Sequence, residues 1–258
     1  MTPSNLRTLA VIALVTTAAV VSFTAQATMA EHAAGPVAKT WTPATLRAAL
    51  TNLPNGSADA GKKVHEQMFC ASCHGAAGVA PTQNWPHLAG QKAAYTAKIM
   101  LDYQDKRRLE GKRAALMHDL AVMMTPQQIA DVAAFYQAQT PPKDDATPRP
   151  SAQPAGTDVP ALTLVRKGDK TRLLTPCASC HGVVGQGGKL EASALAGQNP
   201  LYFVRTMLDF KNGVRHSDSA KGMRVFAQKL SRSEIDALAT YYADLPTAQA
   251  APAGLFGR

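Results

Sequence analysis

One unit occurs twice in this chain of 258 residues, and this repeat constrains the fold more than any other feature. The hexapeptide Cys-Ala-Ser-Cys-His-Gly at residues 70–75 returns unchanged at residues 177–182, an offset of 107. Self-similarity at a fixed offset indicates that one folding unit is repeated. Further stretches keep the alignment, the last after a slip of one residue: 88–91 with 195–198, 100–102 with 207–209, and 117–136 with 223–242.

Composition marks the boundaries of the two units. Residues 141–160 hold six prolines together with Asp, Ser, Gly and Thr, a composition typical of extended linkers rather than of a packed core. We therefore expect an N-terminal extension, a first domain, a linker, a second domain and a disordered tail, at residues 31–57, 58–140, 141–160, 161–246 and 247–258.

Residues 1–30 have the pattern of a secretory signal peptide. Arg7 is the only charged side chain, an apolar run extends from Leu9 to Val21, and Ala25-Gln26-Ala27 offers a small-residue cleavage site. Because this run is shorter than the roughly 20 residues that span a bilayer, a cleaved signal is favoured over a membrane anchor. The mature protein is expected in the periplasm, with membrane association as the alternative.

The apolar residues of each unit recur with helical spacing. Thr125-Pro126 and Ser231 with Glu234 are helix-start signals, and no stretch alternates with period two for long enough to predict a strand. The expected fold class is all-α. The predicted helices cover residues 58–69, 92–104 and 125–139, then 164–174, 200–212 and 231–244, with a short extra helix from Thr42-Pro43.

Each hexapeptide contains Cys-x-x-Cys-His, the attachment signature of a c-type haem. Two thiols one helical turn apart can add to the two vinyl groups of one porphyrin, and the next histidine can ligate the iron. Two independent chance matches have odds of about 10⁻⁶. We expect two covalent haem c groups, attached through Cys70, Cys73, Cys177 and Cys180, with His74 and His181 as axial ligands.

Other uses of the cysteines fit less well. A thioredoxin-like pair needs a βαβ setting, and a zinc site would join ligands across 103 residues and a proline linker. Disulfides would not explain why His and Gly follow both pairs. Aromatic residues make up only 6% of the chain, so a haem would also complete each small core.

The second axial position separates an electron carrier from a haem enzyme, because it is either filled or open. Met100 and Met207 lie on the apolar stripe of a predicted helix, which favours core packing. Met117 and Met223 follow polar, glycine-containing stretches, where a loop can present a thioether, and they are the predicted ligands. Three methionines have no methionine at the equivalent position of the other unit and are expected to be packing residues: Met68, Met123 and Met124. The histidines outside the motifs have no histidine counterpart either, and they are expected to be surface or hydrogen-bonding residues: His65, His87, His118 and His216.

The chain from about Ala58 to Leu245 resembles the dihaem cytochrome c4 family, which has two class I cytochrome c domains in tandem. The resemblance rests on the two hexapeptides, Leu-Ala-Gly-Gln followed by Tyr95, Met117, residues 129–136 and 210–215, and the counterparts in the other unit. It implies thioether links at the four cysteines and periplasmic electron transfer, often towards a terminal oxidase. It also implies the axial pairs His74/Met117 and His181/Met223.

The net charge is +9, with +2 on residues 58–140 and +5 on residues 160–245. Either a positive rim that steers an acidic redox partner or an ordinary solvated surface would explain these charges. The basic residues crowd the stretches leading to the two methionines, with the last one directly after Met223: Lys106, Arg107, Arg108, Lys112 and Arg113, then Arg215, Lys221 and Arg224.

The favoured hypothesis is an electron carrier between respiratory partners, not an enzyme. The partners expected are acidic-surfaced or membrane-bound redox proteins: a terminal oxidase, a quinol:cytochrome c reductase or a dehydrogenase. The alternative is a cytochrome subunit of one dehydrogenase complex, and a haem peroxidase, which needs an open iron and a distal acid–base group, is least favoured. No nucleic-acid partner is expected.

Overall fold

The computed structural model describes residues 39–141 and 161–245, which all belong to one compact unit. The predicted signal peptide, nearly all of the linker and the tail lie outside the described residues. Within the described residues the secondary structure is helical, and the only β-type pairing is an isolated bridge between Asp169 and Leu174. The all-α prediction is confirmed.

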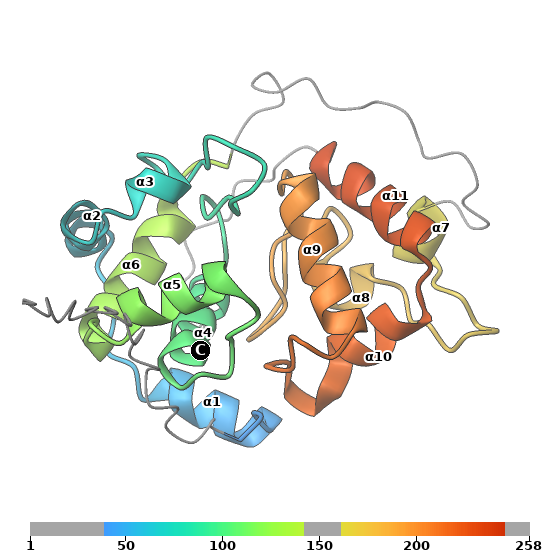
Figure 1. The fold of residues 1–258 in the computed structure, drawn as a ribbon, viewed down its shortest axis with the longest axis horizontal. Helices are drawn as coiled ribbons and strands as arrows, with labels where there is room; N and C mark the ends of the chain where they lie inside the picture. The colour runs from blue at the N-terminus through green and yellow to red at the C-terminus, as the bar shows by residue number, and fades with distance from the viewer. Residues whose placement is uncertain (1–38, 142–160, 246–258) are drawn as a thin grey trace, which may run out of the picture. The chain divides into compact units, whose positions relative to one another are not determined.

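The first domain is built around α6, which packs against α2 and α4 (Figure 1). Helix α5 packs on α4, and the short N-terminal helix α1 also contacts α4. The helices are α1 (Pro43–Thr51), α2 (Ala58–Gln67), α3 (Ala71–His74), α4 (Ala93–Gln104), α5 (Lys112–Ala121) and α6 (Pro126–Ala138).

In the second domain α9, the counterpart of α4, contacts α10 and α11, just as α4 contacts α5 and α6. Helix α7 packs on α11. The elements are α7 (Ala161–Arg166), α8 (Ala178–His181), α9 (Pro200–Lys211), the 3₁₀ turn η1 (Ser219–Lys221), α10 (Gly222–Lys229) and α11 (Arg232–Ala243).

The cap signals place three helix starts correctly. Thr42, Thr125 and Ser231 each accept a hydrogen bond from the backbone N–H three residues later, and that residue's side chain returns a bond to the cap. A capping box satisfies two backbone donors that the first helical turn leaves free. These local hydrogen bonds explain why the starts of α1, α6 and α11 follow from sequence.

The helix predicted over residues 164–174 is wrong in its second half. Helix α7 ends at Arg166, and Gly168 takes a positive φ of 69°. A Cβ at Gly168 would lie 2.1 Å from the carbonyl oxygen of Leu174, so the turn requires glycine. The chain then folds back through the Asp169–Leu174 bridge, where the Asp169 carboxylate accepts from the Thr171 N–H at 2.9 Å.

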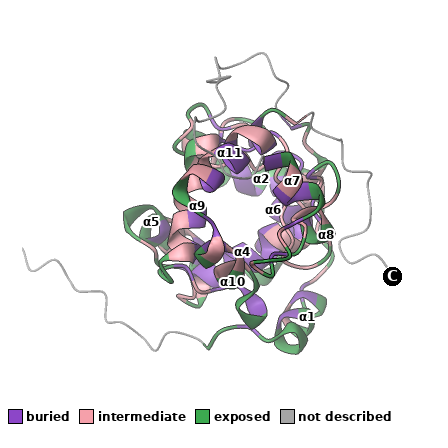
Figure 2. Ribbon diagram, turned by 90° about the vertical axis from the view of Figure 1, so that its right-hand side faces the viewer, coloured by how far each residue is buried: buried purple, intermediate pink, exposed green. Residues whose placement is uncertain are grey.

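The polar stretch before Met117 is a loop only up to Gly111; from Lys112 it is a helix, so Met117 does not lie in the predicted loop. Helix α5 carries Met117, and it buries only Ala114 and Ala121, whereas α6 buries seven of its thirteen residues. Figure 2 shows this contrast between α5 and the helices of the core. An apolar face of two alanines gives almost no periodic signal, which is why the sequence pattern did not reveal this helix.

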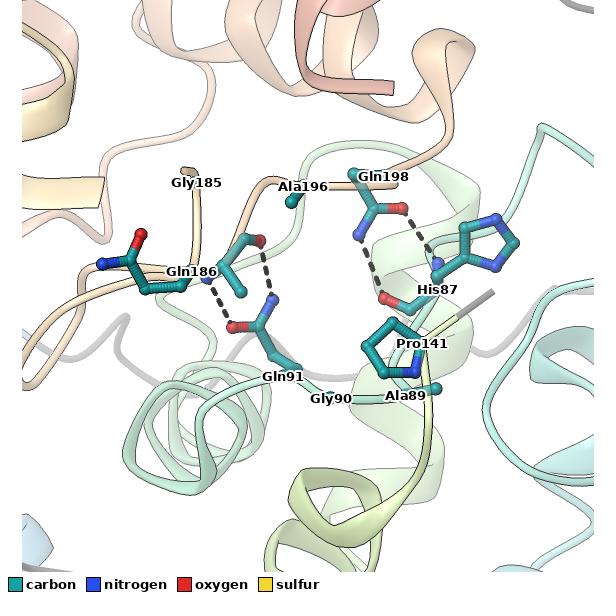
Figure 3. Close-up of a pocket in the computed structure, with 10 residues that line it drawn as sticks. His87, Ala89, Gly90, Gln91, Pro141, Gly185, Gln186, Ala196 and Gln198 are labelled. Atoms are coloured by element: carbon teal, nitrogen blue, oxygen red, sulfur yellow. Dashed lines mark hydrogen bonds between the residues drawn. The ribbon is translucent and has the colours of Figure 1, made fainter. Parts of the chain in front are cut away.

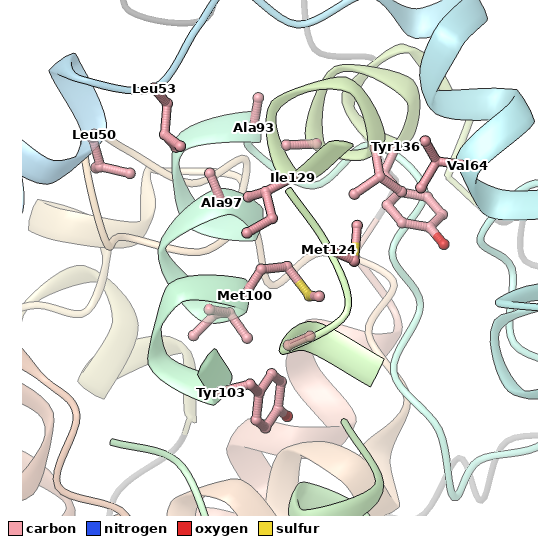
Figure 4. Close-up of a cluster of buried hydrophobic side chains, with 14 of the residues drawn as sticks. Leu50, Leu53, Val64, Ala93, Ala97, Met100, Tyr103, Met124, Ile129 and Tyr136 are labelled. Carbon is pink, nitrogen blue, oxygen red and sulfur yellow. The ribbon is translucent and has the colours of Figure 1, made fainter. Parts of the chain in front are cut away.

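The two methionines predicted to be core residues are buried. Met100 is 9% exposed and Met207 is 6% exposed, each within the apolar cluster of its domain. Figure 4 shows Met100 among Leu50, Ala97 and Ile129, which come from α1, α4 and α6. Met124 is buried and Met68 packs on the same cluster, but the packing prediction is wrong for Met123, whose side chain is exposed.

Helices α2 and α6 approach each other so closely that only glycine fits at position 61. A Cβ there would lie 2.0 Å from the carbonyl oxygen of Asp131. We expect Gly61→Ala to lower the free energy of unfolding by about 2 kcal/mol, because overpacking forces the helices apart. Denaturant unfolding of the haem-loaded protein would measure this effect. Gly222→Ala, at a helical φ with no neighbour within 4 Å, is the control and should leave stability near that of the wild type.

Candidate haem sites

Each Cys-x-x-Cys-His motif forms one short helical turn. The His74 N–H donates to the carbonyl of Cys70 at 3.0 Å, and His181 repeats this bond to Cys177 at the same distance. The glycine after each histidine has a positive φ, and a Cβ at Gly75 would lie 2.0 Å from the Val79 carbonyl oxygen. The two cysteines of each motif therefore sit on a single turn that glycine closes, as attachment to one porphyrin requires.

Both motif histidines are held in the orientation that suits an iron ligand. His74 Nδ1 lies 3.1 Å from the Pro86 carbonyl oxygen, and His181 Nδ1 lies 2.9 Å from that of Ser193. A carbonyl can only accept, so Nδ1 carries the proton and Nε2 keeps its lone pair. Burial lowers the pKa of both imidazoles, which favours the neutral form that binds metal.

The loops that supply these carbonyls are anchored in the same way in the two domains. The Leu88 N–H donates to Gly78 at 2.7 Å, and Leu195 does the same to Gly185 at 2.8 Å. The glycine of each repeated Leu-Ala-Gly-Gln donates to the carbonyl of a tyrosine in the last helix, Tyr136 or Tyr242, at 2.8 Å. The two histidine sites are thus built on equivalent scaffolds.

The two predicted methionine ligands lie at the margins of these cores. Met117 is in α5 and Met223 is in the first turn of α10, and both are half-buried. Met223 packs on the second apolar cluster together with Cys177 and Leu195, while Met117 packs on the first. In each domain, the predicted methionine therefore packs on the same apolar cluster as the leucine of the Leu-Ala-Gly-Gln loop, Leu88 or Leu195.

The repeated glutamines join the two domains (Figure 3). Gln91 Nε2 donates to the Ala194 carbonyl at 3.1 Å, and the Ala194 N–H returns a 2.8 Å bond to Gln91 Oε1. Gln198 makes the same pair of bonds with the backbone of His87, at 3.0 and 2.9 Å. Because 87 and 194 are equivalent positions, the contact is self-complementary, like the interface of a twofold dimer.

The buried arginines fit the acidic side chains of a porphyrin. Arg215 is 2% exposed, and its Nη2 donates to the Tyr95 hydroxyl at 3.3 Å. Its Nε and Nη1 are buried without a partner, which is costly unless an acceptor is present. Two free N–H groups on one guanidinium match a carboxylate such as a haem propionate. The residues present therefore fit a haem.

The inward orientation of arginine weakens the idea of a continuous basic rim. Arg108 is buried and donates to Glu110 at 2.7 Å, and Arg224 pairs with Asp218 at 2.7 Å. Among the eight basic residues named near the two methionines, those exposed to solvent are Lys112, Arg113 and Lys221.

The histidines outside the motifs make ordinary hydrogen bonds. His118 Nδ1 lies 2.6 Å from the Tyr103 carbonyl oxygen, and Nδ1 of His87 accepts from the Ala80 N–H at 2.9 Å. His216 bonds the Val214 carbonyl oxygen at 3.1 Å. His65 is not a surface residue: it is 2% exposed, with Nδ1 2.8 Å from the Tyr136 hydroxyl.

Two equivalent helical domains, each presenting a Cys-x-x-Cys-His turn with a buried neutral histidine, define a c-type cytochrome with two haems. Residues 58–139 match the cytochrome c family, and residues 172–241 match "cytochrome c oxidase, cbb3-type, subunit III". Cytochrome c4 of Pseudomonas aeruginosa is 33% identical over 76% of this chain and 93% of its own length. The chain belongs to the cytochrome c4 family.

Two further comparisons extend this result. The crystal structure of reduced recombinant cytochrome c4 from Pseudomonas stutzeri aligns with a TM-score of 0.63 and 28% identity, over 74% of this chain and all of that one. A thiosulfate dehydrogenase electron acceptor from Stutzerimonas stutzeri is 28% identical over 80% of this chain and 94% of its own. The protein is a dihaem electron-transfer cytochrome with two covalent haem c groups.

Proposed function

We propose that the protein is an exported carrier that moves electrons between respiratory partners in the periplasm, with the axial pairs His74/Met117 and His181/Met223. The observation that carries the proposal is the matched pair of histidines, each with Nδ1 bound to a carbonyl and Nε2 left for a metal. An iron bound by His and Met exchanges single electrons and has no position open for a substrate.

The chain's own residues supply the remaining requirements of a carrier. Cys70 and Cys73, and equally Cys177 and Cys180, would hold each porphyrin through thioether links. Arg215 would neutralise a buried propionate, and the glutamine pairs would keep the two domains in contact for electron passage between them. None of the helices in the described part of the chain has the length and apolar character of a membrane span.

A terminal oxidase is the proposed acceptor, and a quinol:cytochrome c reductase or a dehydrogenase is the proposed donor. The match of the second domain to an oxidase subunit supports an oxidase. The exposed Lys112, Arg113 and Lys221 would favour partners with acidic surfaces. The second candidate function is that of the electron-accepting subunit of one particular dehydrogenase. The similarity to a thiosulfate dehydrogenase electron acceptor favours this candidate. Copurification of a dehydrogenase with the tagged native protein would distinguish the two.

A potentiometric titration of the purified holoprotein, followed optically, tests the carrier proposal. We expect two low-spin haems of positive potential that both have the methionine–ferric charge-transfer band and bind neither carbon monoxide nor peroxide, because each iron is closed by sulfur. A haem that binds carbon monoxide or turns over peroxide in the wild type would contradict the proposal for that domain.

A further inference from the structure

A buried lysine of the first domain contacts the chain segment that leads to Met223 in the second. Lys98, in α4, is 2% exposed, and its Nζ donates to the Ser217 carbonyl oxygen at 2.7 Å. Ser217 is fully buried and precedes Met223 by six residues. A charged donor bound to a buried carbonyl gives one of the stronger hydrogen bonds of a protein, so this contact fixes the backbone of the segment.

Lys98 is oriented by two further residues of the N-terminal half. Its Nζ lies 2.6 Å from Asp102 Oδ2, one helical turn along α4, and Asp102 is fully buried. The other oxygen, Asp102 Oδ1, accepts from the Trp41 indole N–H at 2.6 Å. Trp41 is held in turn by the Arg107 guanidinium, whose carbon lies 3.6 Å from the ring centroid. Lys98 is therefore held in a single orientation.

Trp41 belongs to a segment outside the part of the chain that matches the cytochrome c family. That match begins at residue 58, whereas Trp41 lies directly before Thr42, the N-cap of α1. Leu46 and Leu50 of α1 are at most 1% exposed within the first apolar cluster, and α1 contacts both α4 and η1. The N-terminal segment that contains Trp41 and α1 thus contacts both α4 of the first domain and η1, which lies just before Met223 in the second.

The contacted segment is itself closely held in the second domain. Glu191 accepts from the Ser219 N–H at 3.0 Å and from its hydroxyl, and it lies 3.8 Å from Lys98 Nζ. Asp218 accepts from both the backbone and the side chain of Arg224, next to Met223. Ala220 and Lys221 have positive φ values of 51° and 60°, a conformation that costs energy without glycine and persists only under such restraint.

We propose that Lys98, oriented by Asp102 and Trp41, is a positioning residue for Met223, so that the first domain holds the sixth ligand of the second haem. This inference rests on the proposed ligation by Met223. Arg205 is the repeat equivalent of Lys98. It donates instead to the Asn84 carbonyl at 2.9 Å, in the loop of the first domain whose Pro86 carbonyl bonds His74. The ligand environment of the second haem therefore depends on contact between the domains.

The test uses Lys98→Met in the haem-loaded protein, with the two methionine-ligand signals assigned by proton NMR through Met117→Ala and Met223→Ala. We expect Lys98→Met to weaken the methionine–iron bond of the second haem only. Carbon monoxide affinity at that haem should rise by about tenfold, its share of the charge-transfer band should fall, and its potential should drop. Arg205→Met, which removes the equivalent contact between domains, is the matched control and should leave the second haem unchanged.

Two further variants keep the proposal testable if Lys98→Met alone does not fold. Trp41→Phe keeps an aromatic ring but removes the donor to Asp102, and it should produce a smaller change of the same kind. Lys98→Met with Asp102→Asn avoids an unpaired buried carboxylate, and it should reproduce the full change. If these folded variants leave the second haem closed, or loosen both haems equally, Lys98 is not a positioning residue. If Met223→Ala itself leaves the charge-transfer band intact, the ligand assignment fails instead.

Discussion

Replacing Met223 by alanine is expected to open the iron of the second haem to carbon monoxide and to lower its potential, while the first haem remains closed. Met223 is half-buried on the same apolar cluster as Cys177, and alanine offers no atom that can ligate iron. Axial ligands set haem potentials over a range of about 0.8 V, and thioether sulfur favours the reduced state. We expect a decrease on the order of 0.1 V or more.

Met117→Ala should have the same effect on the first haem alone. Optical redox titration and carbon monoxide binding measure both variants. Met100→Leu and Met207→Leu are the matched controls, because these buried methionines pack in the apolar clusters and similar volume preserves the packing. A Met223→Ala protein whose second haem stays closed at an unchanged potential would show that another residue is the ligand.

Replacing both Cys177 and Cys180 by serine is expected to halve the covalently bound haem and to unfold the second domain. The two sulfurs lie on one helical turn beside the buried His181, so the change removes the attachment without altering the first site. Cys177 and Ala178 of the motif turn pack against the second apolar cluster, which includes four alanines. The porphyrin would supply much of the apolar volume of that core, and its loss should cost more than a domain of this size can tolerate.

Haem staining of the denatured chain and hydrogen exchange of the native protein measure the two effects. Slow-exchanging amides should be lost in α9 and α11 but kept in α4 and α6. The pair Cys70→Ser with Cys73→Ser should give the reverse pattern. Two haems that stay attached in the first variant would show that these cysteines are not the attachment points.

Local signals in the sequence account for the part of the structure that could be predicted. The N-cap and proline at Thr125-Pro126 and the capping box of Ser231 and Glu234 predicted where α6 and α11 begin, because a cap bonds residues only three positions away. Signals that depend on burial were weaker. Helix α5 could not be recognised because it buries only two alanines. His65 is one of the expected hydrogen-bonding histidines, but the sequence did not show that it is buried, because its neighbours Phe135 and Tyr136 lie about 70 residues along the chain.

The sequence by itself determined that the protein has two equivalent haem-attachment turns in helical domains, since these features need only residues close along the chain. The tertiary structure decided what the repeated glutamines and the buried charges contact. Gln91 and Gln198 bond the opposite domain, and Lys98 reaches Ser217. No periodic pattern in the sequence predicts these contacts. Their acceptors are backbone carbonyls more than 100 residues away, and every residue has a backbone carbonyl, so the partner's identity leaves no signal in the sequence.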